Sequence, residues 1–198
     1  IRPGPTPPRP KAAMIAIRPL THFDPAGFVA LAGGYTATAV YRVTRAESDA
    51  ETTFRLSLEP LPAPREFRFP YHADELLRYA ESIPGPFGLG AFDGERLVAI
   101  ALGEERAWNR SLWVWEFHVD AAYQRRGIGR RLMNEMAARG RAAGLRALVL
   151  ETQNTNVSAI RFYRAAGLTL DGLNVSHYTN DDLGPDGTVA LFMTRRLE

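Results

Sequence analysis

The chain has 198 residues and no cysteine, and its 24 basic and 22 acidic residues give a formal net charge of +2. The absence of cysteine excludes disulfides, thiolate metal sites and an acyl-cysteine intermediate, and so small a net charge does not favour nucleic acid as a partner. No apolar run approaches the ~20 residues that span a membrane, and residues 1–13 lack the apolar stretch of a secretory signal. We therefore expect a cytoplasmic protein without membrane contacts.

The N-terminal region divides into an arm and the beginning of a domain. Residues 1–13 contain five prolines, so we expect them to form a flexible, extended arm. The whole chain is 45% hydrophobic and 23% charged, which is typical of a globular protein. Residues 14–198 are numerous enough for one domain with its own core. The sequence therefore predicts a single domain over residues 14–198.

The first elements of this domain follow from local patterns. Residues 14–18 are mostly apolar and predict a short strand. Asp24 and Pro25 predict the start of a helix, with Asp24 as its N-cap and Pro25 at its first position. Gly33 and Gly34 are expected to end this helix.

Two alternating segments, at residues 36–45 and 52–58, predict a hairpin joined by a polar link. The three prolines at positions 60, 62 and 64 are expected to end its second strand, because proline cannot donate to a hydrogen-bond ladder. This extra N-terminal hairpin comes before the alternating strands and helices that are expected in the rest of the chain.

The remaining elements alternate between strands and helices, and Asp93-Gly94 is a strong turn signal between two of the strands. In order, we expect a helix at 73–81, strands at 87–92, 96–103 and 111–120, a helix from Ile128, a strand at 145–151, a further helix, and strands at 169–178 and 188–196. The linker at 180–187 is polar and is expected to be exposed. This order predicts an α/β (α+β) fold, with a mixed, mostly antiparallel twisted sheet and helices on both faces.

A glycine-containing loop, Gln124 to Gly129, joins the strand at 111–120 to an amphipathic helix. Such a junction aims several backbone N–H groups and the positive end of a helix at one point, which suits a diphosphate. The ATP-binding loop and the dinucleotide fingerprint both require glycine or lysine positions that are missing here.

The loop resembles the pyrophosphate-binding motif of the GCN-five-related N-acetyltransferases, the GNAT superfamily, whose pattern is Gln or Arg, two residues, Gly, one residue, and Gly or Ala. A second GNAT pattern is Asn, two residues, Ala, two residues, an aromatic residue with Tyr, and then Gly with an apolar residue. It is matched in order by Asn156, Ala159, Phe162, Tyr163, Gly167 and Leu168. The resemblance covers about residues 87–196. A likeness to the streptothricin acetyltransferase branch is carried by Leu150, Glu151, Thr152, Gln153, Asn156, Gly172 and Tyr178.

The resemblance implies the GNAT fold and acetyl-CoA as co-substrate. It implies that the strand before the loop splays from its neighbour at a bulge, so that the pantetheine arm can pair with the strand edge. The donor contacts expected on this basis are Phe117, His118, Val119, Gln124, Arg125, Arg126, Gly127, Ile128, Gly129, Arg130, Asn156, Ala159 and Tyr163. Which of the three arginines binds phosphate stays open. No metal is expected, since the histidines show no metal-ligand spacing.

Acyl transfer to an amine requires a base, an oxyanion donor and an acid for the departing thiolate. Glu116 is the candidate base, and strand alternation places His118 on the same face, where the two could share a water relay. Glu151 is the rival base, and pairing of Glu116 with an arginine is the structural alternative. The motif match makes Tyr163 the candidate acid, although a tyrosine at this position could also simply belong to the core. Backbone N–H groups near Val119 are candidate oxyanion donors.

The resemblance suggests an acetyltransferase that acts on a primary amine of a small molecule, such as a streptothricin-like antibiotic, by direct attack in a ternary complex. Glu116, Asp120 and Glu151 would attract a cationic acceptor. The alternatives are a protein N-terminal or lysine acetyltransferase and a non-catalytic acyl-CoA-binding protein. The hairpin at 36–58 could make or block a peptide groove, and the aromatic segment 67–71 is interpreted as a cover of the core rather than as part of an acceptor pocket. The protein is expected to be a monomer or a homodimer.

Overall fold

The three-dimensional structure is a computed structural model that describes residues 15–83 and 85–197. The predicted flexible arm at residues 1–13 lies outside the described residues. Within them, seven strands form one sheet in the order β1-β4-β5-β6-β7-β9-β8. All neighbouring strands are antiparallel except the parallel pair β6 and β7. The predicted mixed, mostly antiparallel sheet is confirmed.

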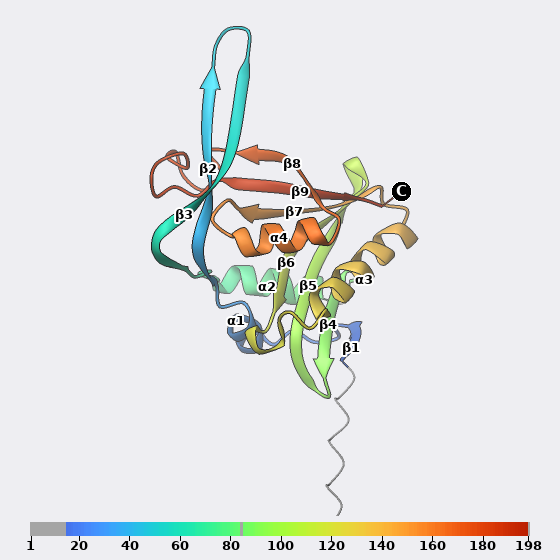
Figure 1. Ribbon diagram of the computed structural model, residues 1–198. Coiled ribbons are helices and arrows are strands. Elements are labelled where there is room, and N and C mark those ends of the chain that lie inside the picture. The colour runs from blue at the N-terminus through green and yellow to red at the C-terminus, as the bar shows by residue number, and fades with distance from the viewer. Residues whose placement is uncertain (1–14, 84, 198) are drawn as a thin grey trace, which may run out of the picture.

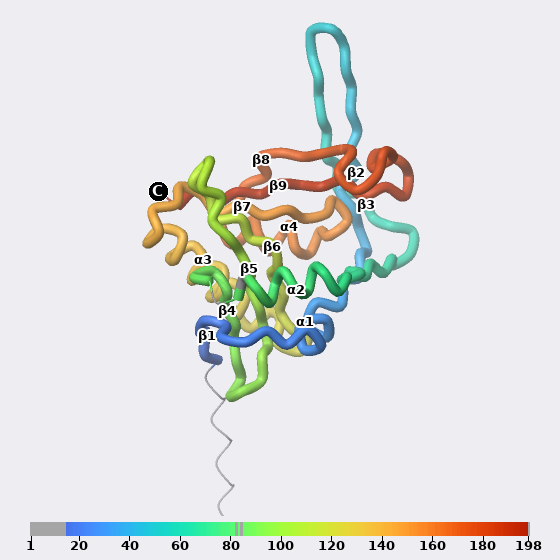
Figure 2. Tube along the Cα trace, turned by 180° about the vertical axis from the view of Figure 1, so that it is seen from behind, coloured from blue at the N-terminus to red at the C-terminus, as the bar shows by residue number. Residues whose placement is uncertain are grey.

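The strands of this sheet are β1 (Ala16–Pro19), β4 (Gly88–Asp93), β5 (Arg96–Arg106), β6 (Ser111–Val119), β7 (Ala147–Gln153), β8 (Thr169–Asn174) and β9 (Ala190–Arg196). The helices are α1 (Pro25–Leu31), α2 (Ala73–Ser82), α3 (Ile128–Ala142) and α4 (Val157–Ala165). Helices α1 and α2 cover one face of the sheet, and α3 and α4 cover the other (Figures 1 and 2). Short 3₁₀ turns lie at Ala107–Asn109 and Ala121–Tyr123.

Each face of the sheet has its own apolar core. On one side, Leu132, Met136 and Ile160 bring α3 and α4 onto the sheet. On the other side, Phe28 and Tyr79 bring α1 and α2 onto β5. The predicted cap of α1 is confirmed, because the Asp24 side chain accepts a hydrogen bond from the Ala26 N–H at 3.1 Å. This arrangement leaves the ends of the central strands for the functional site.

The N-terminal hairpin differs from its prediction in length. Strands β2 (Tyr35–Glu47) and β3 (Thr52–Phe67) form a separate two-stranded ribbon that projects from the body of the molecule (Figures 1 and 2). The expectation that the prolines end the second strand is wrong, because β3 continues to Phe67. The register jumps from Ala39 opposite Pro60 to Ala37 opposite Arg65. The later prolines therefore lie in a bulge, where a strand residue does not have to donate to the ladder.

The segment after β8 also differs from its prediction. Strand β8 ends at Asn174 instead of extending to residue 178, and residues 175–189 form a loop. The carboxylate of Asp182 accepts hydrogen bonds from the backbone N–H groups of His177, Tyr178 and Thr179. Asp182 is only 2% exposed, so the linker that was expected to be exposed is organised around a buried carboxylate.

Strands β6 and β7 diverge part-way along their length. They pair only over Ser111–Val114 and Ala147–Leu150. A bulge in β6 at Trp115 follows, since Val114 lies opposite Gly103 and Glu116 lies opposite Leu102. Beyond the bulge, β6 stays with β5 while β7 stays with β9. The bulge and splay implied by the family resemblance are therefore present, and they leave two strand edges facing each other without a ladder between them.

Asn154, directly after β7, ties the ribbon to the sheet. Its Nδ2 donates to the Tyr41 carbonyl at 2.9 Å, and its Oδ1 accepts from the Val189 N–H at 2.8 Å. Its backbone also bonds to the same two residues. Because Asn154 is 6% exposed, water cannot replace these contacts readily.

We predict that Asn154→Ala destabilises the protein. The change leaves the Tyr41 carbonyl and the Val189 N–H with one lost partner each, and a buried polar group without its partner costs about 1–3 kcal/mol. We expect a total loss of about 2–4 kcal/mol, with a melting temperature lower by about 2–4 °C for each kcal/mol. Thermal and urea unfolding would measure this. Asn180→Ala is the matched control, because Asn180 is exposed, and an equal loss there would contradict the prediction.

Candidate active site

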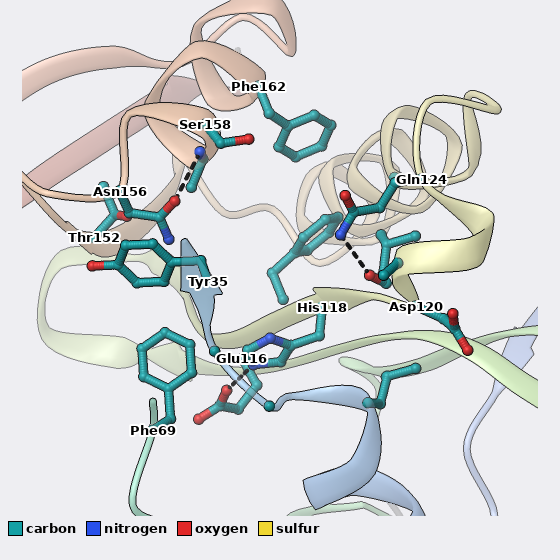
Figure 3. Close-up of a pocket in the computed structure, with 18 of the residues that line it drawn as sticks. Tyr35, Phe69, Glu116, His118, Asp120, Gln124, Thr152, Asn156, Ser158 and Phe162 are labelled. Carbon is teal, nitrogen blue, oxygen red and sulfur yellow. Dashed lines mark hydrogen bonds and ion pairs between the residues drawn. The ribbon is translucent and has the colours of Figure 1, made fainter. Parts of the chain in front are cut away.

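A cleft of about 1070 Å³ opens where β6 and β7 diverge. One side is formed by β6 and the loop that follows it, and the other by the end of β7 and the start of α4 (Figure 3). The α1–β2 connection and residues 69–71 close one end. The cleft thus joins the two sequence motifs in one space.

The loop before α3 has the backbone geometry of an anion site. Arg125 and Gly127 both have left-handed backbones, with φ of 58° and 80°, and Gly127 is the N-cap residue of α3. Gly127 is suited to this position because L side chains rarely adopt such a φ. The first N–H groups of α3 have no partner within the helix, and the helix dipole adds positive potential there. Gln124 braces the loop by donating from Nε2 to the Val119 carbonyl at 3.1 Å.

Most of the residues predicted to contact the donor line the cleft, and two do not. Those that line the cleft are Phe117, His118, Val119, Gln124, Arg125, Gly127, Gly129, Arg130, Asn156, Ala159 and Tyr163. Arg126 and Ile128 do not line it. The Arg126 guanidinium lies over the Tyr123 ring at 5.1 Å, and the Ile128 side chain is in the core with 2% exposure. Of the three candidate arginines, Arg125 and Arg130 line the cleft.

Asn156 lies across the cleft from β6 (Figure 3). It is the N-cap of α4, and its side-chain oxygen accepts from the Ala159 N–H at 3.1 Å. This hydrogen bond uses the carbonyl oxygen of the side chain and leaves its NH₂ group for another acceptor. The three-residue spacing of Asn156 and Ala159 in the motif is therefore the spacing between an N-cap residue and the N–H group that it caps.

Glu116 lies at the other end of the cleft in a network of hydroxyl and imidazole groups. It is 8% exposed. Its Oε1 accepts from the Tyr79 hydroxyl at 2.6 Å, and its Oε2 is 3.1 Å from the Tyr71 hydroxyl and 2.5 Å from His118 Nε2. Burial raises the pKa of Tyr71 and of Tyr79 above the ordinary value of a tyrosine, so both hydroxyls stay protonated and donate. No arginine pairs with Glu116 within the described residues, unlike the structural alternative considered from the sequence.

Tyr71 and Tyr79 were not predicted as site residues. The aromatic segment 67–71 was interpreted as a cover of the core, and this is incomplete, because Phe69 and Tyr71 line the cleft while Tyr71 also packs against the core. Tyr79 comes from α2, where helical spacing predicts only a buried position. Its hydroxyl also lies 3.0 Å from Glu75 Oε1. A pairing between residues 37 positions apart in the chain leaves no local signal in the sequence.

Charge is distributed unevenly along the cleft. Arg125 and Arg130 line the loop end, whereas Glu75, Glu116 and Glu151 line the opposite end. Within the described part of the chain, none of these three carboxylates forms an ion pair with lysine or arginine. The cleft therefore has a cationic end and an anionic end.

Asp120 does not contribute an unpaired negative charge to the anionic end, although the sequence predicted that it would help to attract a cationic acceptor. Its carboxylate is 2.8 Å from an Arg96 nitrogen, and it also caps the following 3₁₀ turn by accepting from the Ala122 N–H. The charge of Asp120 is thus already compensated.

Glu151 faces the cleft from β7 and accepts a hydrogen bond from the Tyr178 hydroxyl. Burial raises the pKa of Glu151, although the hydrogen bond from Tyr178 opposes this effect. The nearby Tyr35 hydroxyl bonds to Thr155 at 2.6 Å, and burial raises the pKa of Tyr35 to about 12. The neutral hydroxyl groups of Tyr35 and Tyr178 therefore lie beside the carboxylate at the anionic end.

Tyr163 reaches the cleft from α4. It is 8% exposed, and its ring meets the Phe117 ring edge-on at 6.3 Å. Burial raises the pKa of Tyr163 well above its ordinary value, so its hydroxyl keeps its proton. Its hydroxyl forms no hydrogen bond with the residues that the structure describes. A buried hydroxyl that lines a cleft and has a free proton is able to donate to a bound molecule.

The sequence model of the acetyltransferase (GNAT) family matches residues 50–168. The chain belongs to the GNAT family. The family predicted from the two motifs is therefore confirmed, and with it the expectation of an enzyme class that uses acetyl-CoA.

Two curated relatives align with part of this GNAT protein. N-alpha-acetyltransferase RimI of Mycobacterium tuberculosis is 37% identical over 93 residues, which are 46% of this chain and 56% of the relative. An uncharacterised protein of Mycobacterium leprae has the same identity over 93 residues, which are 25% of its length. The chain thus spans about half of one relative and a quarter of the other.

Solved structures match over more of the chain. The crystal structure of a nourseothricin acetyltransferase has a TM-score of 0.72 and 28% identity, covering 93% of this chain and 99% of that one. A protein of Bacillus anthracis, provisionally named a streptothricin acetyltransferase and solved with acetyl coenzyme A, has a TM-score of 0.73 and 22% identity, covering 95% and 100%. The second similarity shows the fold alone, and both confirm the predicted fold class.

Two further findings concern the described residues only. In residues 15–83 and 85–197, no group of three or more histidine, aspartate or glutamate side chains is placed to hold a metal ion. None of the helices in this part of the GNAT chain is both long and apolar enough to cross a membrane.

We predict that Glu151→Gln stabilises the fold at neutral pH. Since the folded pKa of Glu151 is raised, its ionised form costs stability, and the cost disappears where the group is protonated in both states. The gain should therefore be present at pH 7 and shrink as the pH falls through the folded pKa towards the ordinary value of 4.5. Urea unfolding at several pH values would measure it.

The matched control is Glu105→Gln, which removes a charge from an exposed position outside the cleft. Its effect should be smaller, because water hydrates this carboxylate in both states. Loss of stability in Glu151→Gln at pH 7 would contradict the prediction, since it would mean that the Tyr178 hydrogen bond outweighs the burial of the charge.

Proposed function

We propose that this GNAT protein transfers an acetyl group from acetyl-CoA to a primary amine of a small cationic molecule, by direct attack in a ternary complex. The observation that carries this proposal is the opposite charge at the two ends of one cleft. The cationic end suits a diphosphate, and the anionic end suits an ammonium group. The similarity to a nourseothricin acetyltransferase over nearly the whole chain supports an aminated antibiotic such as streptothricin as the acceptor.

The residues present fit the donor. The N–H groups of Arg126, Gly127, Ile128 and Gly129 would hold the pyrophosphate, with help from the side chains of Arg125 and Arg130. A Cβ at Gly127 would meet nothing within 4 Å, so the space beside the loop is open. The edge of β6 that leaves β7 offers its backbone groups to the pantetheine amides, and the Asn156 NH₂ group faces it. When bound, acetyl-CoA supplies an activated acetyl thioester.

The chain's own groups provide the proton transfers. The Glu116–His118 pair removes a proton from the ammonium group, so that the nitrogen lone pair can attack the thioester carbon. A backbone N–H near Val119 stabilises the resulting oxyanion. The protonated Tyr163 hydroxyl donates to the sulfur as the carbon–sulfur bond breaks, and it recovers its proton from solvent.

The aromatic side chains at the anionic end also suit an ammonium acceptor. Tyr35 and Phe69 line the cleft close to Glu116 (Figure 3), and aromatic faces attract cations. Tyr35 and Phe69 also line a second cavity of about 530 Å³. This adjoining space gives room for the part of an acceptor that does not react.

A second candidate is acetylation of a peptide N-terminus, which the similarity to RimI favours. A peptide would have to enter the anionic end past Tyr35 and Phe69. The hydrogen bond between Tyr35 and Thr155 joins the base of the ribbon to the β7–α4 loop at this point. This closure favours a compact acceptor over a long chain. A panel of streptothricin-like antibiotics, diamines and short peptides, assayed by release of free thiol, distinguishes the two candidates.

We predict that Gly127→Glu weakens acetyl-CoA binding by at least about tenfold. The substitution places a negative charge where the helix N-terminus would attract phosphate, an interaction worth up to about 2 kcal/mol. Titration calorimetry would measure the dissociation constant. Gly94→Glu is the matched control, because Gly94 also has a left-handed backbone with no atom within 4 Å of an added Cβ, and it lies outside the cleft.

Both variants should lose similar stability from backbone strain, about 1–2 kcal/mol, but only Gly127→Glu should lose donor affinity. Equal affinities for the two variants would contradict the proposed donor site. Absence of acetyl-CoA binding by the unmodified protein would overturn the proposed function as a whole.

We predict that Tyr163→Phe lowers kcat by about 10²- to 10⁴-fold, the range expected for loss of a general acid, while acetyl-CoA affinity stays within about twofold. Steady-state assays of thiol release with an accepted amine would measure this. Tyr41→Phe removes a hydroxyl that bonds to Arg164 outside the cleft and should leave kcat unchanged. An unaffected kcat in Tyr163→Phe would exclude the acid role, and binding without turnover of any amine would favour the non-catalytic alternative.

A further inference from the structure

We propose that His118 is the catalytic residue that takes the proton from the acceptor ammonium, and that Glu116 is a positioning residue behind it. The inference rests on the proposed acetyl transfer and reverses the order of the two groups expected from the sequence. It starts from the occupancy of the Glu116 carboxylate. One oxygen accepts from Tyr79, and the other contacts both Tyr71 and His118.

A general base needs a free lone pair within reach of the substrate. Glu116 is 8% exposed, and hydroxyl or imidazole groups already contact both of its oxygens. The His118 imidazole lies between Glu116 and the open part of the cleft (Figure 3). A bound amine would therefore meet the imidazole before the carboxylate.

The contact with Glu116 also selects the tautomer of His118. A carboxylate accepts hydrogen bonds, so His118 Nε2, at 2.5 Å from the Glu116 oxygen, carries the proton. The Tyr71 hydroxyl lies 3.3 Å from the same Nε2 and fits this assignment, because it donates its own proton to Glu116 and its oxygen can accept from Nε2–H. In the neutral imidazole this leaves Nδ1 with an available lone pair. Within the described residues, Nδ1 has no hydrogen-bond partner. The Phe28 and Phe69 rings pack edge-on against the imidazole at 5.9 and 6.0 Å, so its orientation is fixed.

The proton balance is simple. The ammonium N–H bond breaks, its proton moves to His118 Nδ1, and the nitrogen keeps the electron pair that attacks the thioester carbon. The imidazolium that forms is stabilised by the adjacent Glu116 carboxylate, as a carboxylate stabilises histidine in a hydrolase triad. His118 then returns the proton to water in the cleft.

The other titratable groups around His118 can be assigned to elements. Tyr71 precedes α2, Glu75 and Tyr79 lie on α2, Glu151 lies on β7, and Tyr163 lies on α4. Helix α1 contributes no charged residue. On β6 the partner is Glu116, and the charged groups beyond β6 that line the cleft are Asp120, Arg125 and Arg130.

The experiment measures kcat, KM and the pH dependence of kcat/KM for His118→Gln, Glu116→Gln and the double variant, with acetyl-CoA affinity from calorimetry. His118→Gln should lower kcat by about 10²- to 10⁴-fold and abolish the acid limb. Glu116→Gln should lower kcat by roughly 10- to 100-fold, as expected for a residue that orients another. The double variant should be no slower than His118→Gln.

Donor affinity should stay within about twofold in all three variants, since β6 offers backbone groups to the donor. His72→Gln is the matched control, because His72 is exposed and lies outside the cleft. A larger loss in Glu116→Gln than in His118→Gln, with the acid limb retained in His118→Gln, would overturn the proposal and assign the base to Glu116.

A second measurement does not require turnover. Nitrogen-15 NMR of the labelled protein, with the His118 signals assigned by their loss in His118→Gln, reports which ring nitrogen carries the proton. We expect the Nε2–H tautomer at neutral pH. The Nδ1–H tautomer would overturn the proposal even if no acceptor were found, so this failure is distinct from failure of the proposed acetyl transfer.

Discussion

The structure depends on the separation of β6 from β7. Two neighbouring parallel strands normally satisfy each other's backbone groups, yet here their ladder stops after four residue pairs. The bulge at Trp115 turns β6 away, and β5 and β9 keep each strand in the sheet by pairing with its other edge. The sheet therefore stays continuous while it opens a space at its centre, and both sequence motifs lie on the borders of that space.

Several groups in this space are held in states that cost stability. Arg125 has a left-handed backbone that a residue with a Cβ seldom adopts. Glu75, Glu116 and Glu151 line one end of the cleft without lysine or arginine partners among the described residues. Structural needs do not explain such an arrangement, because pairing or exposure of these groups would be more favourable. These costs support the proposed function, in which one end of the cleft binds phosphate and the other binds a cation.

The sequence predicted those features that short-range patterns determine. The loop at residues 124–129, the Asp24 cap and the helix and strand order follow from spacing within a few residues, and the structure confirms them. The contacts of Glu116 with Tyr71 and Tyr79 join segments that are far apart in the chain, so no periodicity reveals them. The prolines of β3 misled the prediction because their effect depends on the register of the partner strand. The Asp182 loop misled it because polar composition does not distinguish an exposed carboxylate from one that binds backbone N–H groups.

The ribbon has a consequence for how the two proposed ends of the cleft, the acceptor end and the donor end, can vary. Much of the wall at the anionic end comes from the ribbon and the segment that follows it. Tyr35 is the first residue of the ribbon, and Phe69 and Tyr71 lie directly after its second strand. The loop that suits phosphate comes instead from the centre of the sheet. Changes in the length or register of the ribbon therefore reshape one end of the cleft and leave the other intact. Under the proposed function, remodelling this one projecting hairpin would change the acceptor that the enzyme takes without changing its donor site.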